Sequence, residues 1–466
     1  MNLRFYNTLS RMQEAFHPLV EDEVRMYTCG PTVHDFAHIG NFRAYIFEDL
    51  LRRTLRMAGS RVIQVMNLTD VDDKTIRKSQ AAGVALNAFT QPYIDAFFED
   101  LATLGIEKAE HYPRATEHIE AMIRLIERLL AKDFAYVSGD GSVYFRIDAY
   151  ARYGELAHLD RSGLKAGARV DQDEYEKDSV GDFALWKAWS EADGPVAWDS
   201  PWGRGRPGWH IECSAMSLAL LGESFDLHTG GVDNIFPHHE DERAQSEAAT
   251  GKPFAHTWMH CAHLMVEGHK MAKSAGNFFT LRDLIGKGYT GREIRYALLS
   301  VHYRMPLNFT FASLDAARSA LLRIDAFSDV LRSAAAGAKS LRIPEWADGA
   351  GRVFREAMAD DLNVSAALAA LFDLIHRGHR EAAAGSWAAE EAAGAQEILN
   401  QMDRILGCVA RPEISVDPQA HRLALEREAA RKARNWAEAD RLRDQIDALG
   451  WKVQDTPKGP ELKPKS

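Results

Sequence analysis

One stretch near the start of the chain constrains the fold most strongly, because a strand, a loop and a long helix follow one another within it. Residues 25–28 have the pattern of the end of a buried strand, which a Gly-Pro pair then interrupts. Over residues 41–58 apolar side chains recur at helical spacing, and residues 62–68 form another apolar, β-branched run. This alternation predicts an α/β fold with a parallel sheet flanked by helices.

The loop before the long helix carries His38, Ile39, Gly40 and Asn41. Backbone N–H groups and the helix dipole at a helix N-terminus can receive a phosphate, and a histidine there can donate a hydrogen bond to phosphate oxygens. Four residues are a weak signal, and a loop histidine that caps the helix is the simpler interpretation of them alone.

A second stretch far downstream strengthens the phosphate interpretation. It has the sequence Lys270-Met271-Ala272-Lys273-Ser274 and is followed by Gly276 and Asn277. Two lysines three residues apart on a glycine-bounded loop can pair with the same polyphosphate from its other side. The two stretches together predict a nucleotide-binding site.

Four further side chains are of the metal-binding type. Cys29 follows the first strand, Cys213 lies in the second half of the α/β pattern, and His238 and Glu242 share one face of a predicted helix. Two thiolates, an imidazole and a carboxylate are acceptable zinc ligands. His239 and Glu242, three residues apart, would also share a face. Spacing alone therefore leaves open which histidine binds, and whether these residues are simply buried core.

A cluster of polar side chains follows the second strand: Thr69, Asp70, Asp72 and Asp73. In open parallel sheets, ligands bind beyond the carboxyl ends of the strands, so this cluster could face a substrate. A solvated acidic turn is equally consistent with the spacing.

Composition and charge exclude several classes of protein. The net charge of −11 weighs against a general nucleic-acid binder, so any RNA partner should be met by local basic faces and by shape. Four scattered cysteines do not form a disulfide framework. No apolar run is long enough for a bilayer span or a signal peptide, so we expect a cytoplasmic protein without membrane contact.

The two phosphate motifs resemble the signature motifs of the class I aminoacyl-tRNA synthetases, usually written His-Ile-Gly-His and Lys-Met-Ser-Lys-Ser. Other stretches are similar to the cysteinyl-tRNA synthetases in particular: Cys29 to Val33, Asn67 to Lys74, Gly208 to Met216, Gly230 to Asp233 and Phe236 to Glu240. The likeness runs from Tyr6 to the last fifty residues. Asn41 stands where the family motif ends in histidine, and Ala272 replaces a serine, which puts the dynamics of that loop in question.

The resemblance implies a role for each candidate site residue. The residues implied in catalysis are His38, Lys270 and Lys273. Those implied in ATP binding are the same three with Gly40, Asn41, Gly230, Gly231 and Asp233. Those implied in binding the substrate cysteine are Cys29, Gly30, Thr69 and Trp209. Those implied as zinc ligands are Cys29, Cys213, His238 and Glu242. From the residues alone, Trp209 could equally be a core aromatic, and the two glycines a plain turn.

The resemblance also implies an activity and its partners. L-cysteine would be activated by ATP to cysteinyl-adenylate and then passed to the 3′ end of tRNA(Cys), with one zinc per subunit selecting the thiol and magnesium accompanying ATP. A monomer is expected. One rival is the shorter ligase that joins activated cysteine to an amino-sugar inositol, which lacks a C-terminal RNA-binding part. The other rival is a non-catalytic tRNA-binding protein, which would not need both phosphate motifs.

The expected architecture is a Rossmann-like class I synthetase catalytic domain with an inserted connective domain, followed by a helical bundle and a small C-terminal RNA-binding domain. The expected order is a first catalytic half (1–120), a connective insertion (121–200), a second half with the zinc ligands (201–265), the lysine loop and stem-contact segment (266–310), a helical bundle (311–408) and an anticodon-binding region (409–466).

Basic and aromatic side chains gather in the last of these regions. Four arginines are predicted to lie near one helical face: Arg427, Arg431, Arg434 and Arg441. A solvated face and an RNA-binding face fit these charges equally well, and the resemblance favours contact with the tRNA anticodon, assisted by Trp436 and Trp451. Residues 458–466 are predicted to be a mobile tail.

Overall fold

The computed structural model describes residues 2–159, 181–272, 276–385, 387–410, 417–456 and 459–464. Contacts divide the chain into two compact units, residues 1–409 and residues 410–466. None of the described helices is long and apolar enough to cross a membrane. The finer division of the first unit into domains stays a prediction.

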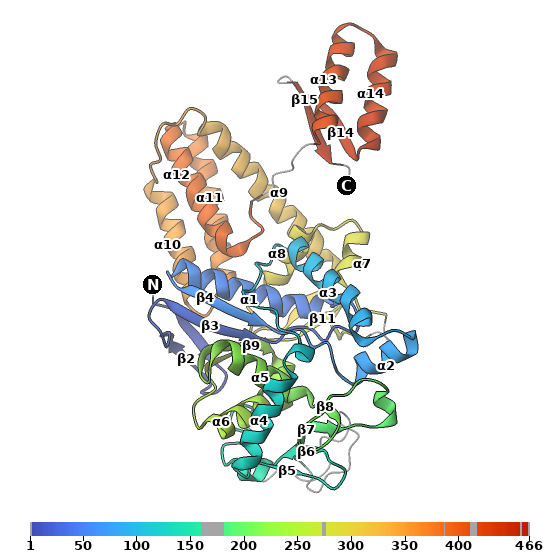
Figure 1. Ribbon diagram of the computed structural model, residues 1–466. Coiled ribbons are helices and arrows are strands. Elements are labelled where there is room, and N and C mark those ends of the chain that lie inside the picture. Colours follow the sequence, from blue (N-terminus) through green and yellow to red (C-terminus); the bar gives the residue numbers. More distant parts are fainter. Residues whose placement is uncertain are drawn as a thin grey trace. The chain divides into compact units, whose positions relative to one another are not determined.

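A parallel four-stranded sheet forms the centre of the first unit, in the order β10-β9-β3-β4. Its strands are β3 (Glu23–Thr28), β4 (Arg61–Met66), β9 (Phe225–Gly231) and β10 (Ala255–Cys261). Helix α1 (Ile39–Met57) packs on one face of the sheet, and α5 (Trp209–Leu221) packs on the other (Figure 1). The predicted α/β class is therefore confirmed.

Several elements surround this sheet. A hairpin of β1 (Arg4–Asn7) and β2 (Met12–Ala15) opens the chain. Helices α2 (Asp73–Ala82), α3 (Leu86–Thr103) and α4 (Ile119–Ala131) follow β4. Helix α6 (Glu240–Thr250) packs against α4 and α5, below the sheet in Figure 1. Helix α6, which belongs to the second half of the α/β pattern, therefore lies near the end of β3.

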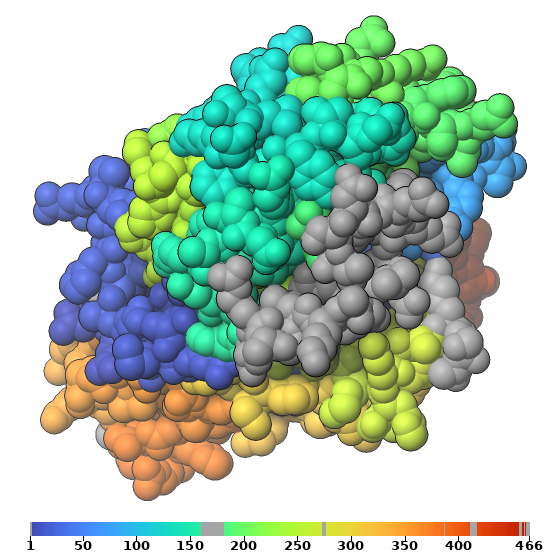
Figure 2. Space-filling model, turned by 90° about the horizontal axis from the view of Figure 1, so that it is seen from below, coloured from blue at the N-terminus to red at the C-terminus, as the bar shows by residue number. Residues whose placement is uncertain are grey.

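A second, antiparallel sheet has three of its strands within the predicted insertion (residues 121–200) and its last strand just beyond it. Its strands, in the order β5-β6-β7-β8, are β5 (Ala135–Val137), β6 (Val143–Phe145), β7 (Phe183–Ala188) and β8 (Gly205–Pro207). The first two form the expected hairpin. Figure 2 shows the teal surface of the stretch before residue 150 beside the green surface of the stretch around residue 200. Strands that come before residue 150 and strands that come after residue 180 therefore belong to one sheet.

A three-stranded sheet carries the lysine motif. It consists of β11 (Leu264–Val266), β12 (His269–Lys270) and β13 (Leu307–Phe309), in the order β12-β11-β13. Helices α7 (Leu281–Gly286) and α8 (Gly291–Leu299) lie between β12 and β13 in the chain. Four helices then pack together, as predicted for this region: α9 (Phe311–Ala334), α10 (Glu345–Ala359), α11 (Val364–Ala383) and α12 (Ala389–Leu406).

The second unit has its own small core. It contains α13 (Pro418–Lys432), α14 (Trp436–Ala448), β14 (Trp451–Thr456) and β15 (Gly459–Pro464), and the two strands pair antiparallel. The predicted mobile tail is therefore wrong for residues 459–464, because their backbone pairs with β14. Lys458 and the last two residues lie outside the described residues.

The predicted arginine face is also wrong. Helix α13 ends at Lys432, and Arg434 adopts a left-handed conformation with φ of 58°, so Arg441 lies on the next helix. Arg427 and Arg431 both bind Asp455. Trp451 is 9% exposed and packs in the core of this unit, whereas Trp436 is 59% exposed. Exposed Arg434, Arg441 and Trp436 are therefore the better candidates for external contact.

Two glycines of the bundle give a matched test of its packing. A Cβ on Gly378 of α11 would lie 2.3 Å from a ring carbon of the fully buried Phe327, whereas a Cβ on Gly349 of α10 would meet nothing within 4 Å. We expect Gly378→Ala to destabilise the bundle by about 1–3 kcal/mol through overpacking. Gly349→Ala should stabilise its helix by about 0.5–1 kcal/mol. Denaturant unfolding measures both, and equal shifts would contradict the packing described.

Candidate active site

Strand ends and the loop after β3 form the floor of the site. The N–H of Cys29 donates to the carbonyl of Thr229 (3.3 Å), and the N–H of Gly30 donates to Oδ1 of Asn67 (2.9 Å). A Cβ at Gly30 would lie 1.8 Å from the carbonyl oxygen of Asn67. Only glycine allows the loop to pass this close to β4, and the loop sets the position of the Cys29 thiol.

The four side chains predicted as metal ligands come together here. One donor atom each from Cys29, Cys213, His238 and Glu242 lies within 4.8 Å of the other three, and the last three residues are buried. Cys213 is on α5, Glu242 is on α6, and His238 lies in the turn before α6. The helical spacing of four residues brings His238 Nε2 to 2.9 Å from Oε1 of Glu242.

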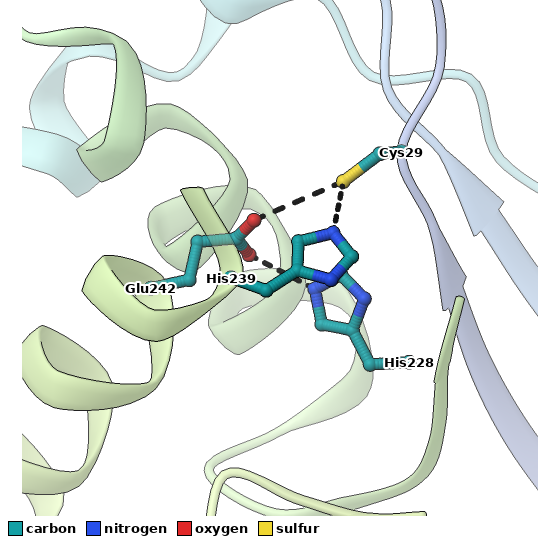
Figure 3. A group of neighbouring side chains, drawn as sticks. All are labelled: Cys29, His228, His239 and Glu242. Carbon is teal, nitrogen blue, oxygen red and sulfur yellow. Dashed lines mark hydrogen bonds and ion pairs between the residues drawn. The ribbon is translucent and has the colours of Figure 1, made fainter. Parts of the chain in front are cut away.

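A second group of donors shares two of these residues (Figure 3). Cys29 and Glu242 also meet His228 and His239, again with one donor atom of each within 4.8 Å of the others. Nε2 of His239 lies 3.2 Å from the Cys29 sulfur, and Nε2 of His228 lies 3.0 Å from Oε2 of Glu242. The spacing of His239 and Glu242 in the sequence indicates the first of these histidines, but not His228. His228 comes near Cys29 because β9 is the neighbour of β3, and no pattern in the sequence specifies that strand order.

A chain of hydrogen bonds orients His238. Its Nδ1 lies 3.0 Å from Nδ1 of His210, and Nε2 of His210 lies 3.3 Å from Oδ2 of Asp241. The hydroxyl of Tyr153 donates to Oδ1 of the same Asp241 (2.5 Å). If His210 donates to Asp241, then its Nδ1 accepts the proton of His238 Nδ1. With its proton on Nδ1, His238 would offer the lone pair of Nε2 to a metal, which would displace the proton that Nε2 otherwise shares with Glu242.

Burial and mutual charge shift the pKa values of these groups. Burial by itself would raise the pKa of Glu242, but His228 and His238 outweigh it and lower that pKa to about 2. Burial would lower the pKa of His238, but Glu242 and Cys213 outweigh it and raise that pKa to about 10. The pKa of Cys213 falls to about 6 because Cys29 and His238 outweigh its burial. The pocket therefore favours the anionic forms of Glu242 and Cys213, whereas burial and the neighbouring Cys213 raise the pKa of Cys29 well above its usual range. A bound cation would take the place of the protons on Cys29 and His238.

Of the predicted cysteine-binding residues, Trp209 borders this group, and Thr69 pairs with the loop that follows Cys29. The indole of Trp209 stacks on His238, with ring centroids 4.2 Å apart and planes 18° apart, and is 39% exposed. Trp209 is therefore a wall of the site and not the core aromatic that was the alternative. Thr69 is 2% exposed, and its hydroxyl accepts a hydrogen bond from the side-chain amide of Asn67 (3.0 Å).

The aspartates that follow Thr69 hold the structure together. Both carboxylate oxygens of Asp70 accept hydrogen bonds from Thr116, and Asp72 caps α2. Asp73 pairs with Lys187 of β7 (3.1 Å) and with Arg206 of β8. Each carboxylate of the acidic cluster thus has a protein partner, and the cluster is in part a solvated turn, because the side chain of Asp73 is 47% exposed.

His38 and Asn41 form a capping box at the start of α1. Nδ1 of His38 accepts from the N–H of Asn41 (3.2 Å), and Oδ1 of Asn41 accepts from the N–H of His38 (3.1 Å). The capping interpretation of His38 is therefore correct as far as Nδ1 is concerned. The ring also contacts Phe278, with centroids 5.3 Å apart, so the helix start lies against the segment after the lysine motif.

The lysine motif approaches the same helix start. A Cβ on Gly40 would lie 3.3 Å from the methyl carbon of Met271, so these two residues face each other. Lys270 is exposed at the end of β12. The N–H of Ala272 donates to Oδ1 of Asn277 (2.8 Å), which shapes the loop without the missing serine hydroxyl. Lys273, the other predicted lysine, lies outside the described residues.

The glycines at the end of β9 leave room for neighbouring groups. A Cβ on Gly230 would lie 2.8 Å from a ring carbon of His239, and one on Gly231 would lie 2.5 Å from Oδ1 of Asp233. The N–H of Gly231 donates to Oδ1 of Asn234 (3.1 Å). Asp233 is exposed. The predicted ATP-binding residues at the end of β9 thus adjoin His239 and, through it, the histidine cluster of His228, His239 and His260.

Family models match three stretches of the chain. Residues 15–319 match the class I tRNA synthetase (C) catalytic domain, residues 353–410 match the DALR domain, and residues 415–460 match the cysteinyl-tRNA ligase anticodon binding domain. The first match alone covers more than half of the chain. Its range includes both phosphate motifs and all four predicted metal ligands.

Curated relatives are similar over nearly the whole chain. A protein of Protochlamydia amoebophila (strain UWE25) named cysteine–tRNA ligase is 49% identical, with 99% of this chain and 98% of that protein covered. A protein of the same name from Chlamydia pneumoniae is 48% identical, with the same coverage of both chains.

Solved structures support the fold. Methionyl-tRNA synthetase of Mycobacterium tuberculosis, in complex with methionyl-adenylate, has a TM-score of 0.61 at 16% identity and covers 83% of this chain and 90% of its own. A LeuRS–tRNA–LeuAMS complex from Agrobacterium radiobacter K84 has a TM-score of 0.64 at 12% identity and covers 84% and 85%. With the family matches and the relatives, these findings place the chain in the cysteine–tRNA ligase family.

Proposed function

We propose that this enzyme activates L-cysteine with ATP, releasing pyrophosphate, and transfers the cysteinyl group to the 3′ end of tRNA(Cys). The observation that carries this proposal is the placement of a thiol-rich donor group and a phosphate-binding helix start on the same sheet. The substrate carboxylate would attack the α-phosphorus in line, and pyrophosphate would leave. The last step joins the activated carboxyl group to a ribose hydroxyl of the terminal adenosine and releases AMP.

The residues of the two motifs would act on phosphate. His38 would donate to a phosphate oxygen from the start of α1, where the helix dipole also favours negative charge. Lys270 and Lys273 would stabilise the charge that develops as pyrophosphate leaves, most strongly in the transition state. Gly40, Asn41, Gly230, Gly231 and Asp233 would bind the rest of ATP, with magnesium on its phosphates.

Cys29, Cys213, His238 and Glu242 fit a zinc ion, because they offer four donors of suitable chemistry from one buried cluster. We prefer them to the group with His228 and His239 because they contain both thiols, and because the hydrogen bonds of His210 and Asp241 turn Nε2 of His238 toward Glu242. A zinc ion held there would bind the substrate sulfur in preference to the hydroxyl of serine.

The same cluster accounts for substrate selection. The residues around the subsite for the substrate thiol would be Gly30, Thr69 and Trp209. An analogue without the thiol would leave the buried groups of this subsite without a partner. A site that reads one specific group rejects such analogues by about 10⁴–10⁵-fold. We therefore expect no separate editing site.

The match of residues 415–460 to an anticodon binding domain favours the synthetase over the shorter cysteine ligase. The exposed side chains of Trp436, Arg434 and Arg441 would contact tRNA in this unit. We expect the enzyme to act in the cytoplasm as a monomer.

The central test is transfer of labelled cysteine to a tRNA transcript that bears the cysteine anticodon, with ATP and magnesium. We expect charging of the tRNA and cysteine-dependent exchange of pyrophosphate into ATP. Exchange without charging would favour the small-molecule ligase. Absence of both reactions would exclude the proposed function.

The metal ligands can be tested with two variants that separate the two donor groups. Cys213 belongs only to the preferred group, and His228 belongs only to the other. We expect Cys213→Ala to lose bound zinc and His228→Gln to retain it, as measured by elemental analysis of the purified proteins. Full retention by Cys213→Ala, or loss only in His228→Gln, would show that the preferred set is wrong.

The role of the second unit can be tested at Trp436. Stacking of a base on an exposed aromatic ring contributes about 1–3 kcal/mol, so Trp436→Ala should raise the KM for tRNA by about tenfold or more. Pyrophosphate exchange, which needs no tRNA, should not change. Leu425→Ala is a control with similar exposure, because Leu425 is 49% exposed in the same unit. Equal effects of the two variants would contradict a stacking role.

A further inference from the structure

The start of α1 and the segment that carries the lysine motif touch at several places. The N–H of Ile39 donates to the carbonyl of Phe279 (3.0 Å), and Gly40 faces Met271. Arg43, one turn further along α1, makes the largest set of hydrogen bonds between them. These contacts decide how far the start of α1 lies from Lys270.

Arg43 binds four backbone carbonyls. Its Nη1 donates to Ala262 (2.5 Å) and His263 (2.6 Å), and its Nη2 donates to His302 (3.5 Å) and Met305. The side chain is buried, with the residue 2% exposed. Every hydrogen bond recorded for its guanidinium within the described residues goes to a main-chain oxygen. The contacts of Arg43 therefore depend on the path of the backbone and not on which side chains its neighbours carry.

The four carbonyls lie at the entries of two strands of the small sheet. Ala262 and His263 directly precede β11, and His302 and Met305 precede β13. The two strands pair in parallel, with Leu264 opposite Leu307, and β11 also pairs with β12, which places Met265 opposite Lys270. Lys270 is thus one strand pairing away from the segment that Arg43 holds.

We propose that Arg43 is a positioning residue that sets β12, with Lys270 at its end, against the start of α1. The inference rests on the proposed function, because it assigns Arg43 to the ATP side of that reaction. Among the described residues, no hydrogen bond joins the carbonyls that Arg43 binds to the proposed metal ligands, which are Cys29, Cys213, His238 and Glu242. Binding of cysteine should therefore not depend on Arg43.

Lysine cannot replace arginine in this role. A guanidinium presents two separate nitrogens in a rigid plane, one for each pair of carbonyls, whereas an ammonium is a single donor atom. Lysine at position 43 would leave one pair of carbonyls without its donor, and the corresponding strand entry would shift. A displacement of about 1 Å in a reacting geometry can reduce the rate about 10²-fold.

The test compares R43K with R295K in the full chain. Arg295 is a matched control because it is also fully buried and also binds main-chain carbonyls, those of Leu406, Leu104 and Gly105, together with the carboxylate of Asp49. Its partners lie at the ends of α3 and α12 and in the middle of α1, away from the lysine motif. Both substitutions should lower the thermal midpoint.

Steady-state pyrophosphate exchange then separates a positioning role from a structural one. We expect R43K to lower kcat/KM for ATP about 10- to 100-fold, while the KM for cysteine and the zinc content stay within about twofold of the wild type. R295K should leave both KM values unchanged below its thermal midpoint. Unchanged ATP kinetics in R43K, an equal change in both KM values, or the same ATP defect in R295K would overturn the proposal.

Two further measurements keep the test decisive. If R43K does not fold, R43Q replaces the charge with a neutral amide that can still serve one pair of carbonyls, and the same kinetics apply. Failure of both variants to fold would overturn the proposal, because Arg43 would then be needed for the fold itself. If the wild type shows no cysteine-dependent exchange, the proposed function fails, and calorimetric ATP binding by wild type and R43K still tests the effect of Arg43.

Discussion

The candidate site depends on one buried carboxylate. Glu242 is fully buried on α6, with His238 Nε2 2.9 Å away and His228 Nε2 3.0 Å away, and its Oε1 lies 3.8 Å from the Cys29 sulfur. An unpartnered charge in this position would cost several kcal/mol, about 3–5 when one member of a buried pair is removed. The same contacts tie α6 to β9 and to the loop after β3. Because the Glu242 carboxylate must have partners, it fixes three elements around the thiols: α6, β9 and the loop after β3.

Local patterns in the sequence are sufficient for the parts of the site whose partners are close in the chain. Helical spacing places His238 and Glu242 on one face, and the strand–loop–helix order places His38 at the start of α1. His228 and His260 depend instead on the pairing of β9 with β10, in which His228 lies opposite Trp258 and His260 opposite Gly230. The sequence does not specify that register, so the histidine cluster could not be predicted from it.

The incorrect or undecided predictions have the same physical origin. Asp70 and Asp73 resemble open ligands until their partners are known, and Thr116, Lys187 and Arg206 lie 46, 114 and 133 residues away in the chain. The arginines of the last region keep a helical spacing in the sequence, but the backbone leaves the helix at Arg434, which is left-handed. Charge spacing carries no information about a left-handed residue that is not glycine. Burial of Trp451 likewise follows from the hairpin of β14 and β15.

Asn41, at the position where the family motif ends in histidine, preserves the chemistry of His38. The N–H of residue 41 donates to Nδ1 of His38, so in the neutral imidazole the proton must be on Nε2. That tautomer is the one that can donate a hydrogen bond to a phosphate oxygen. The bond to Nδ1 comes from the main chain and does not need a histidine at position 41. The amide oxygen of Asn41 then closes the capping box on the N–H of His38, which fixes the ring at the helix start. Asn41 therefore retains both the orientation and the protonation of His38 that the proposed phosphate contact needs.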